Sequence, residues 1–171
     1  GGDGAFGFTS QALGSFAVQT SGGAGQQTFA NLRPGSYDLS ETAQTGWDLT
    51  GATCANGSSP ASVRVAAGEN VVCTFTNTQR GSLTVVKNTV GGDGQFAFAS
   101  RALGNFSLAT SGRTAQKSFG GLVPGVYDLA ETAPAGWDLT SATCSDGSDP
   151  GSVNLAPGED VTCTFENTQR G

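Results

Sequence analysis

Three polar residues lie on the apolar faces of hydrophobic segments, where their side chains could react with one another. In SLTVVKN, GVYDLAET and VTCTFEN, the residues Lys87, Glu131 and Asn167 stand an even number of positions from Leu, Val, Tyr, Cys or Phe. Successive side chains of a strand point to opposite faces, so each polar residue shares a face with apolar ones. A buried, unpaired charge is costly, so an amine, a carboxyl and an amide placed there must satisfy one another or react.

A simpler arrangement of the same residues is also open. Lys87 could extend its amine to water from a strand end, and Asn167 could cap the last turn. The residues alone do not separate this arrangement from a reactive one.

The cysteines form two pairs in equivalent places, each flanking a turn-rich segment. We predict disulfides within each half of the chain, each closing a loop worth about 3 kcal/mol. The alternatives are disulfides between the halves and free thiols. A zinc site is disfavoured because the sequence has no CxxC pair and no histidine. Disulfides indicate an oxidising compartment. The four residues are Cys54, Cys73, Cys144 and Cys163.

The remaining candidate sites are more simply structural. Aspartates in GGDG and SDGSDPG could be calcium ligands, but the spacing of a calcium loop is absent and turn formation explains them. The tryptophan of each GWDLT could stack on a sugar, although packing on a core is the simpler role. With no histidine, GxSxG or phosphate loop, we expect no enzyme, cofactor or metal. The residues concerned are Asp3, Asp93, Asp146, Asp149, Trp47 and Trp137.

Composition limits the partners. The chain has 171 residues and a net charge of −6, which disfavours nucleic acid and anionic membranes. Its apolar runs are too short for membrane insertion.

The sequence repeats itself after 90 residues without a gap. About 50 of the 81 overlaid positions are identical, including LRPGSYDLSETAQTGWDLTGATC against LVPGVYDLAETAPAGWDLTSATC. Short alternating runs separated by Gly, Pro, Asp and Ser clusters predict antiparallel strands, hence two all-β sandwich modules. We place them at residues 1–80 and 81–171, with Gly81 as hinge.

One predicted strand has no counterpart. SLTVVKN opens the second module, whereas the first begins at GGDG without it. We therefore expect the first module to lack its N-terminal strand, which a preceding repeat or another subunit would supply.

The elements LTVVKN, YDLAETAPAGW and CTFENT resemble those of CnaB/SpaA-type, prealbumin-like (Ig-like) domains of Gram-positive surface proteins and pili. The resemblance covers essentially each whole module. It implies an isopeptide bond from Lys87 to Asn167, assisted by Glu131 in a single-turnover maturation step. In the first module Glu41 and Asn77 match, and the partner lysine lies outside the chain.

These features together predict a structural repeat of an extracellular bacterial stalk or filament, whose partners are copies of itself or adjacent repeats. The alternative is an adhesin module that binds a host protein or glycan through loops. The loops that differ most, SGGAGQQ and SGRTAQK, are where such recognition would lie.

Overall fold

The computed structural model describes residues 2–171 and divides into two compact units, residues 1–79 and residues 80–171. The expected start of the first module at Gly1 lies outside the described residues. All named elements are strands, as the alternation predicts, and the described residues contain no helix able to span a membrane. Unit 1 contains β1 (Ala5–Thr9), β2 (Phe16–Gln19), β3 (Gly35–Tyr37), β4 (Ser40–Glu41), β5 (Trp47–Cys54), β6 (Val63–Val65) and β7 (Cys73–Gln79). Unit 2 contains β8 (Gly81–Val90), β9 (Gln95–Ala99), β10 (Phe106–Ala109), β11 (Thr114–Leu122), β12 (Gly125–Tyr127), β13 (Ala130–Thr132), β14 (Trp137–Cys144), β15 (Val153–Leu155) and β16 (Asp160–Gln169).

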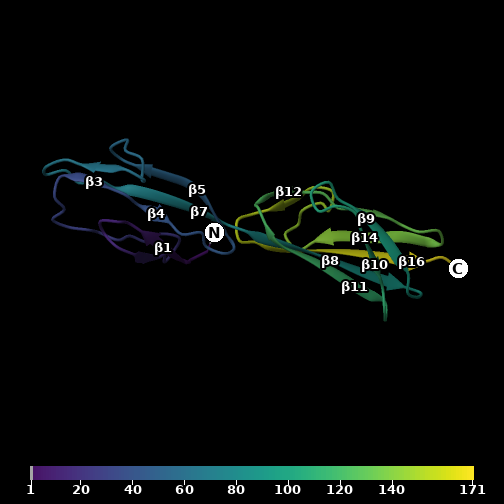
Figure 1. The fold of residues 1–171 in the computed structure, drawn as a ribbon. Helices are drawn as coiled ribbons and strands as arrows, with labels where there is room; N and C mark the ends of the chain where they lie inside the picture. The colour runs from purple at the N-terminus through teal and green to yellow at the C-terminus, as the bar shows by residue number, and fades with distance from the viewer. Residues whose placement is uncertain (1) are drawn as a thin grey trace. The chain divides into compact units, whose positions relative to one another are not determined.

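Two sheets enclose the core of unit 2 (Figure 1). One has the order β11-β8-β16-β14 and the other β10-β9-β13, while β12 pairs with β15. Apolar side chains from both sheets meet between them: the rings of Phe98 on β9 and Phe165 on β16 lie 5.1 Å apart, edge to face. Both phenylalanines are buried, so the alternating residues of each strand close a sandwich core.

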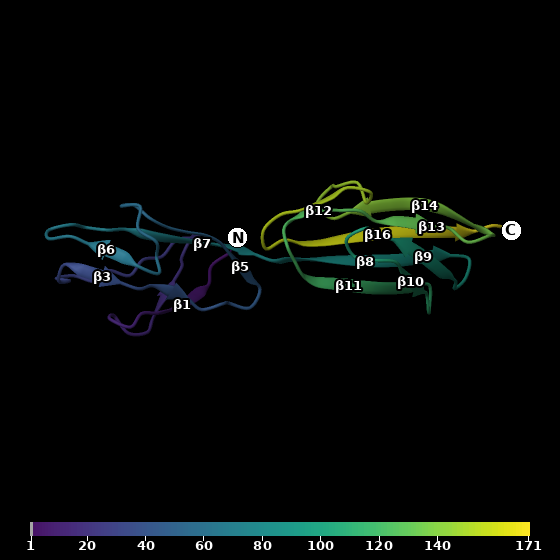
Figure 2. The same cartoon turned by 45° about the horizontal axis from the view of Figure 1, so that its top comes forward.

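The first and last strands of unit 2 lie side by side, β8 between β11 and β16 (Figure 2). Their pairing is parallel, whereas every other ladder in the described residues is antiparallel. Parallel neighbours need a long connection, and here nearly the whole module provides it. The consequence is that residues far apart in sequence, on β8 and β16, face the same core.

The segment GVYDLAET, expected as one strand, is divided between two sheets. β12 pairs with β15 and β13 pairs with β9. At the break, the backbone N–H of Leu129 donates to the carbonyl of Pro150 (2.8 Å), and the Asp128 carboxylate accepts from the N–H of Arg101 (3.1 Å). These bonds draw the backbone out of a single ladder, so Glu131 belongs to the sheet opposite β8.

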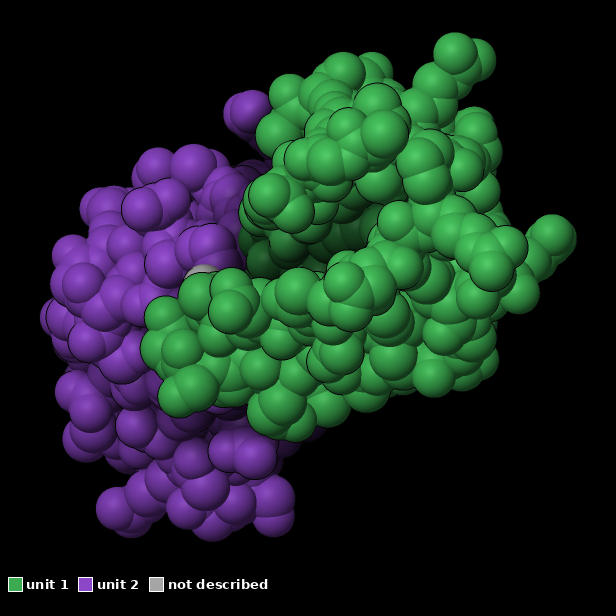
Figure 3. All heavy atoms as spheres, turned by 90° about the vertical axis from the view of Figure 1, so that its left-hand side faces the viewer, with its two compact units in different colours: residues 1–79 green, residues 80–171 purple. Residues whose placement is uncertain are grey.

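Unit 1 has the same plan with one sheet unfinished. Its ladders are β2-β1-β4, β5-β7 and β3-β6. Within residues 2–79, β7 pairs with β5 and has no strand on its other edge, and residues 25–32 form no strand although the equivalent residues of unit 2 belong to β11. Unit 1 therefore has no counterpart of β8 in its described residues. In the space-filling view, unit 1 is hollowed on the face turned to the viewer (Figure 3).

The missing strand changes how well the core of unit 1 is covered. Residues on its strands are half-buried where the matching residues of unit 2 are buried. Phe75, for example, is half-buried, whereas the matching Phe165 is only 2 % exposed. The less buried positions of unit 1 are Val18, Leu39, Trp47, Val65, Val71, Cys73, Phe75 and Asn77.

Candidate functional site

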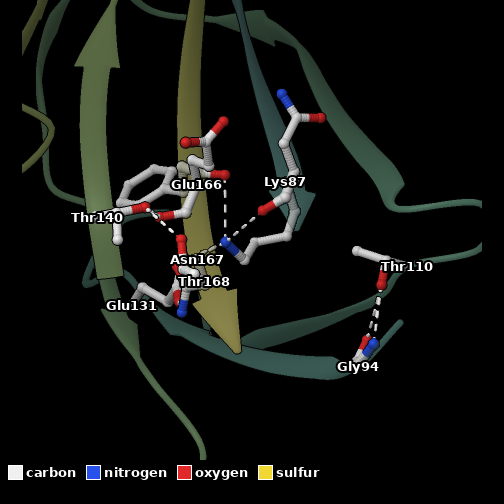
Figure 4. Close-up of polar contacts among 10 residues, drawn as sticks. Lys87, Gly94, Thr110, Glu131, Thr140, Glu166, Asn167 and Thr168 are labelled. Atoms are coloured by element: carbon white, nitrogen blue, oxygen red, sulfur yellow. Dashed lines mark hydrogen bonds and ion pairs between the residues drawn. The ribbon is translucent and has the colours of Figure 1, made fainter. Parts of the chain in front are cut away.

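The candidate site of unit 2 is assembled from three strands. Lys87 lies on β8, where it pairs with Phe165 in the parallel ladder and with Ala115 in the antiparallel one. Asn167 lies near the end of β16, and Glu131 lies on β13 in the opposite sheet. The amine and amide thus come from one sheet and the carboxyl from the other, and all three point into the space between (Figure 4).

The three side chains are in direct contact. Lys87 Nζ donates to Asn167 Oδ1 (2.7 Å), and Asn167 Nδ2 donates to Glu131 Oε1 (2.6 Å). Glu131 Oε2 lies 3.4 Å from Lys87 Nζ and has no other polar partner. The carboxyl of Glu131 therefore touches both the amine and the amide nitrogen. The contacts of Nζ are drawn as dashed lines in Figure 4.

Burial sets the electrostatics of this cluster. Lys87 and Asn167 are 0 % exposed, and the Glu131 side chain is equally inaccessible. Burial lowers the pKa of Lys87 below its usual 10.5, against the attraction of Glu131, which raises it. The amine also donates to the backbone carbonyls of Phe165 (3.2 Å) and Asn88 (3.1 Å). A lysine held this way is biased towards its neutral, nucleophilic form.

The simpler arrangement from the sequence does not hold for these residues. Lys87 does not reach water from a strand end, because it is among the largest fully buried side chains of the described residues. Asn167 does not cap a turn, because its amide lies between Lys87 and Glu131 inside the core.

The arrangement has the requirements of amide exchange. A nucleophilic amine lies beside an amide carbonyl, and a carboxyl that can carry protons bridges the two. The three side chains are closed to solvent and held in contact, which supplies a high effective concentration.

Unit 1 holds two of the three residues. Glu41 is on β4 and Asn77 is on β7, the positions of Glu131 and Asn167. The structure leaves Glu41 Oε2 buried without a hydrogen-bond partner. A lysine equivalent to Lys87 is absent from residues 2–79, since that part of the sequence contains none.

Comparison with known families identifies the fold of both units. The model of the SpaA_4 family, described as a prealbumin-like fold domain, matches residues 1–79 and again residues 83–169. The chain belongs to this family. Its two units are two prealbumin-like modules in tandem.

Similar solved structures include the T-13 major pilin of Streptococcus pyogenes, with 14 % identity over 98 % of this chain and 90 % of that one (TM-score 0.37). The C-terminal fragment of the pilus adhesin SpaC of Lactobacillus rhamnosus GG has 14 % identity over 98 % and 89 % (TM-score 0.36). The Bacillus anthracis TIE protein has 17 % identity over 98 % and 31 % (TM-score 0.35). Likeness at these scores carries no argument about function. No curated protein shows significant sequence similarity to the chain.

Each prealbumin-like module carries one disulfide. Cys54 is bonded to Cys73 and Cys144 to Cys163, both within a module. The bonded residues are directly opposite each other, in the β5–β7 and β14–β16 ladders. Each bond joins a module's last strand to its antiparallel neighbour.

The aspartates of the GGDG turns accept hydrogen bonds from the backbone of a neighbouring loop. Asp3 accepts from the backbone N–H groups of Gly22 (3.0 Å) and Gly23 (2.7 Å), and Asp93 from those of Gly112 and Arg113. These bonds lower the pKa of both carboxyls. Asp146 and Asp149 accept bonds within their own turn. The described residues contain no group of side chains able to hold a metal ion.

Around the site, one contact agrees with the sequence prediction and two others were not anticipated. Trp137 packs on Phe96 edge to face (5.3 Å), in agreement with its expected core role. The same Phe96 ring lies 4.4 Å from Lys87 Nζ, a cation–π contact that strand parity gave no means to find. Asp138 forms an exposed ion pair with Arg170, and the repetition of GWD and TQR in both modules was the available signal for it.

Proposed function

We propose that the chain is a structural repeat of an extracellular bacterial stalk or fibre, in which the second module closes itself with an isopeptide bond between Lys87 and Asn167. The observation that carries this proposal is the buried contact of amine, amide and carboxyl across three strands. Tandem modules with one disulfide each, and a family of prealbumin-like domains, support a load-bearing extracellular role. We take residues 1–80 and 81–171 as the repeating modules.

The bond-forming step balances within the cluster. The neutral amine of Lys87 attacks Cγ of Asn167, a C–N bond forms, and the C–Nδ2 bond breaks. Counted over the whole reaction, the lysine starts as ammonium and gives up two protons, one before the attack and one after it. Nδ2 takes up both protons and leaves as ammonium. Glu131, in contact with Nζ and Nδ2, carries protons from one to the other. The step occurs once per molecule and needs no cofactor.

The position of the bond explains its mechanical value. The chain enters the module at the start of β8 and leaves at the end of β16, so pulling shears this parallel pair. A bond from Lys87 to Asn167 transfers the load directly between the two strands. The intervening residues 88–166 then carry no tension.

The same role extends to assembly, because the open edge of β7 can be completed by a strand from a neighbouring repeat or subunit. The proposed partners are therefore further copies of this repeat.

Single-molecule stretching tests the proposed function. With disulfides reduced, we expect unit 2 to show no unfolding extension, while Lys87→Met releases about 79 residues, or about 270 Å at about 3.4 Å per residue. Unit 1, which has no lysine at this position, unfolds in both proteins and is the internal control. Full extension of unit 2 in the unaltered chain would contradict the proposal.

A further inference from the structure

We propose that Phe96 controls the bond-forming step by holding the amine of Lys87 in its unreactive, ammonium form. This inference rests on the bond proposed for unit 2 and adds a regulating residue to that site. Its basis is the position of the amine, which lies over the Phe96 ring at 4.4 Å from the ring centre. The face of an aromatic ring attracts a cation, and the attraction is largest where water is excluded.

The Phe96 ring is fixed by its neighbours in the sandwich. It is fully buried on β9 and meets the Trp137 ring edge to face, with the ring centres 5.3 Å apart. Gly94 packs against both rings: a Cβ there would lie 3.1 Å from Phe96 and 3.3 Å from Trp137. The Thr110 hydroxyl accepts from the N–H of Gly94 (2.9 Å) and donates to its carbonyl (3.3 Å) (Figure 4). The ring therefore cannot turn away from the amine without disturbing this packing.

Unit 1 contains the same aromatic arrangement without an amine. Phe6 meets Trp47 edge to face at 5.2 Å, and a Cβ at Gly4 would lie 3.1 Å from the Phe6 ring. Residues 2–79 contain no lysine, so packing alone places the two rings. In unit 2 the amine of Lys87 thus lies over a ring whose position the core determines.

The ring differs from the carboxylates that also favour the ammonium form. The charged groups that raise the pKa of Lys87 are Glu131 on β13, 3.4 Å from Nζ, and Glu166 on β16. Glu131 loses its charge whenever it carries a proton from Nζ to Nδ2. The Phe96 ring has no proton to exchange, so it continues to attract the ammonium while Glu131 is neutral.

Uncharged groups complete the surroundings of the amine. β11 places Ala115 opposite Lys87, whereas the amine of Lys117 on the same strand lies over the ring of Phe106 (5.0 Å). Two backbone carbonyls accept hydrogen bonds from Nζ of Lys87. Burial lowers the pKa of Lys87, and the ring of Phe96 offsets part of this effect.

Control by the ring has a characteristic effect on the rate. Only the neutral amine attacks, so a group that stabilises the ammonium moves the reaction to higher pH. It does not change the reactivity of the amine once this is neutral. Weakening the attraction of the ring should therefore move the pH profile of the rate downwards and leave its alkaline plateau unchanged. A purely structural role of Phe96 would change the plateau.

Fluorination of the ring tests this directly, because fluorine withdraws electron density from the ring face and nearly preserves the shape of the side chain. With a trifluorinated phenylalanine in place of Phe96, the midpoint of the pH profile should move down by about one unit. At neutral pH the full chain, diluted from urea and followed by mass, should lose ammonia about tenfold faster. Phe96→Leu, which keeps an apolar side chain, should move the midpoint in the same direction.

The same fluorinated residue in place of Phe98 is the matched control. Phe98 is buried on the same strand, where its ring meets those of Phe106 and Phe165. Its fluorination should leave the profile in place. Identical profiles with and without fluorine on Phe96, or an equal shift from Phe98, would overturn the role of Phe96.

A direct measurement on the amine separates this inference from the bond itself. Glu131→Gln should leave Lys87 unbonded, and NMR of chain labelled with carbon-13 lysine reports its pKa, with Lys117 as the internal reference. Fluorination of Phe96 should lower the pKa of Lys87 by about one unit. If no protein loses ammonia, the bond is overturned, and this shift alone decides the role of the ring. If ammonia is lost while neither the pKa nor the profile moves, the bond stands and control by Phe96 is overturned.

Discussion

The amide oxygen of Asn167 lies 2.7 Å from the amine nitrogen of Lys87, although 80 positions separate the two residues in sequence. The parallel pairing of β8 and β16 brings them together, and Glu131 reaches both from the opposite sheet. A contact between the first and last strands of a module fixes its two ends to each other.

Replacing Glu131 with Gln should prevent the bond, because the amide cannot carry protons between Nζ and Nδ2. Without the bond, a loop of about 80 residues is free in the unfolded chain, so unit 2 should lose about 4.5 kcal/mol of unfolding free energy by the loop-entropy relation. Denaturant unfolding of unit 2, followed by the fluorescence of Trp137, measures this loss. Glu41→Gln is the matched control and should leave unit 2 unchanged, and equal stability of the two variants would contradict the role of Glu131.

The rate of bond formation should rise with pH. Only the neutral amine attacks, and burial lowers the pKa of Lys87. The pH at which the rate is half-maximal should therefore lie below the usual lysine pKa of 10.5. Before the bond forms, Lys87 has a higher pKa in the unfolded chain than in the folded module, so the unfolded chain keeps this proton to higher pH. Stability before bonding should therefore also increase with pH up to the ordinary lysine pKa.

A chain purified unfolded in urea and diluted into buffers from neutral to alkaline gives the time course of ammonia loss by mass spectrometry. A rate that does not change with pH would show that deprotonation of Lys87 is not required.

Hydrogen exchange should distinguish the two modules at equivalent positions. Residues 25–32 form no strand and should exchange quickly, whereas β11 should be protected by its ladder with β8. Amides of β7 that face its open edge should likewise exchange faster than those of β16. Equal protection of the two modules would contradict an open edge of β7.

Removing the disulfide of unit 2 should weaken the module without preventing the bond. The double change Cys144→Ala and Cys163→Ala opens a loop of 19 residues, worth about 3 kcal/mol in the loop-entropy relation. The side chains of Lys87, Glu131 and Asn167 make no contact that needs this disulfide, so the loss of ammonia should persist. Unfolding free energy and intact mass are read on the same sample, with Cys54→Ala and Cys73→Ala as the matched pair in unit 1.

Much of the fold could be predicted because it depends on local alternation and on repetition. Strand parity placed Lys87 and Asn167 on the buried faces, and the gapless repeat located the strand missing from unit 1. Parity does not determine which strands become neighbours, so the parallel β8–β16 pairing was not accessible. The division of GVYDLAET into two strands depends on a hydrogen bond from Leu129 to Pro150, a tertiary contact that no local pattern contains.

The candidate site was predictable in membership but not in geometry. Strand parity singled out Lys87, Glu131 and Asn167, and resemblance to the family implied a bond between two of them. The bridging of amine and amide by one carboxyl became visible only in the assembled sandwich. The ring of Phe96 beside the amine was missed because it comes from the facing sheet, whose registry with β8 is set by packing.

The bond between Lys87 and Asn167 is tested most directly by the intact mass of the chain after reduction and alkylation, followed by peptide mapping. A Lys87–Asn167 bond predicts a mass about 17 Da below that of the sequence, with both residues in one branched peptide. The full mass of the sequence, with Lys87 and Asn167 recovered in separate linear peptides, would contradict it.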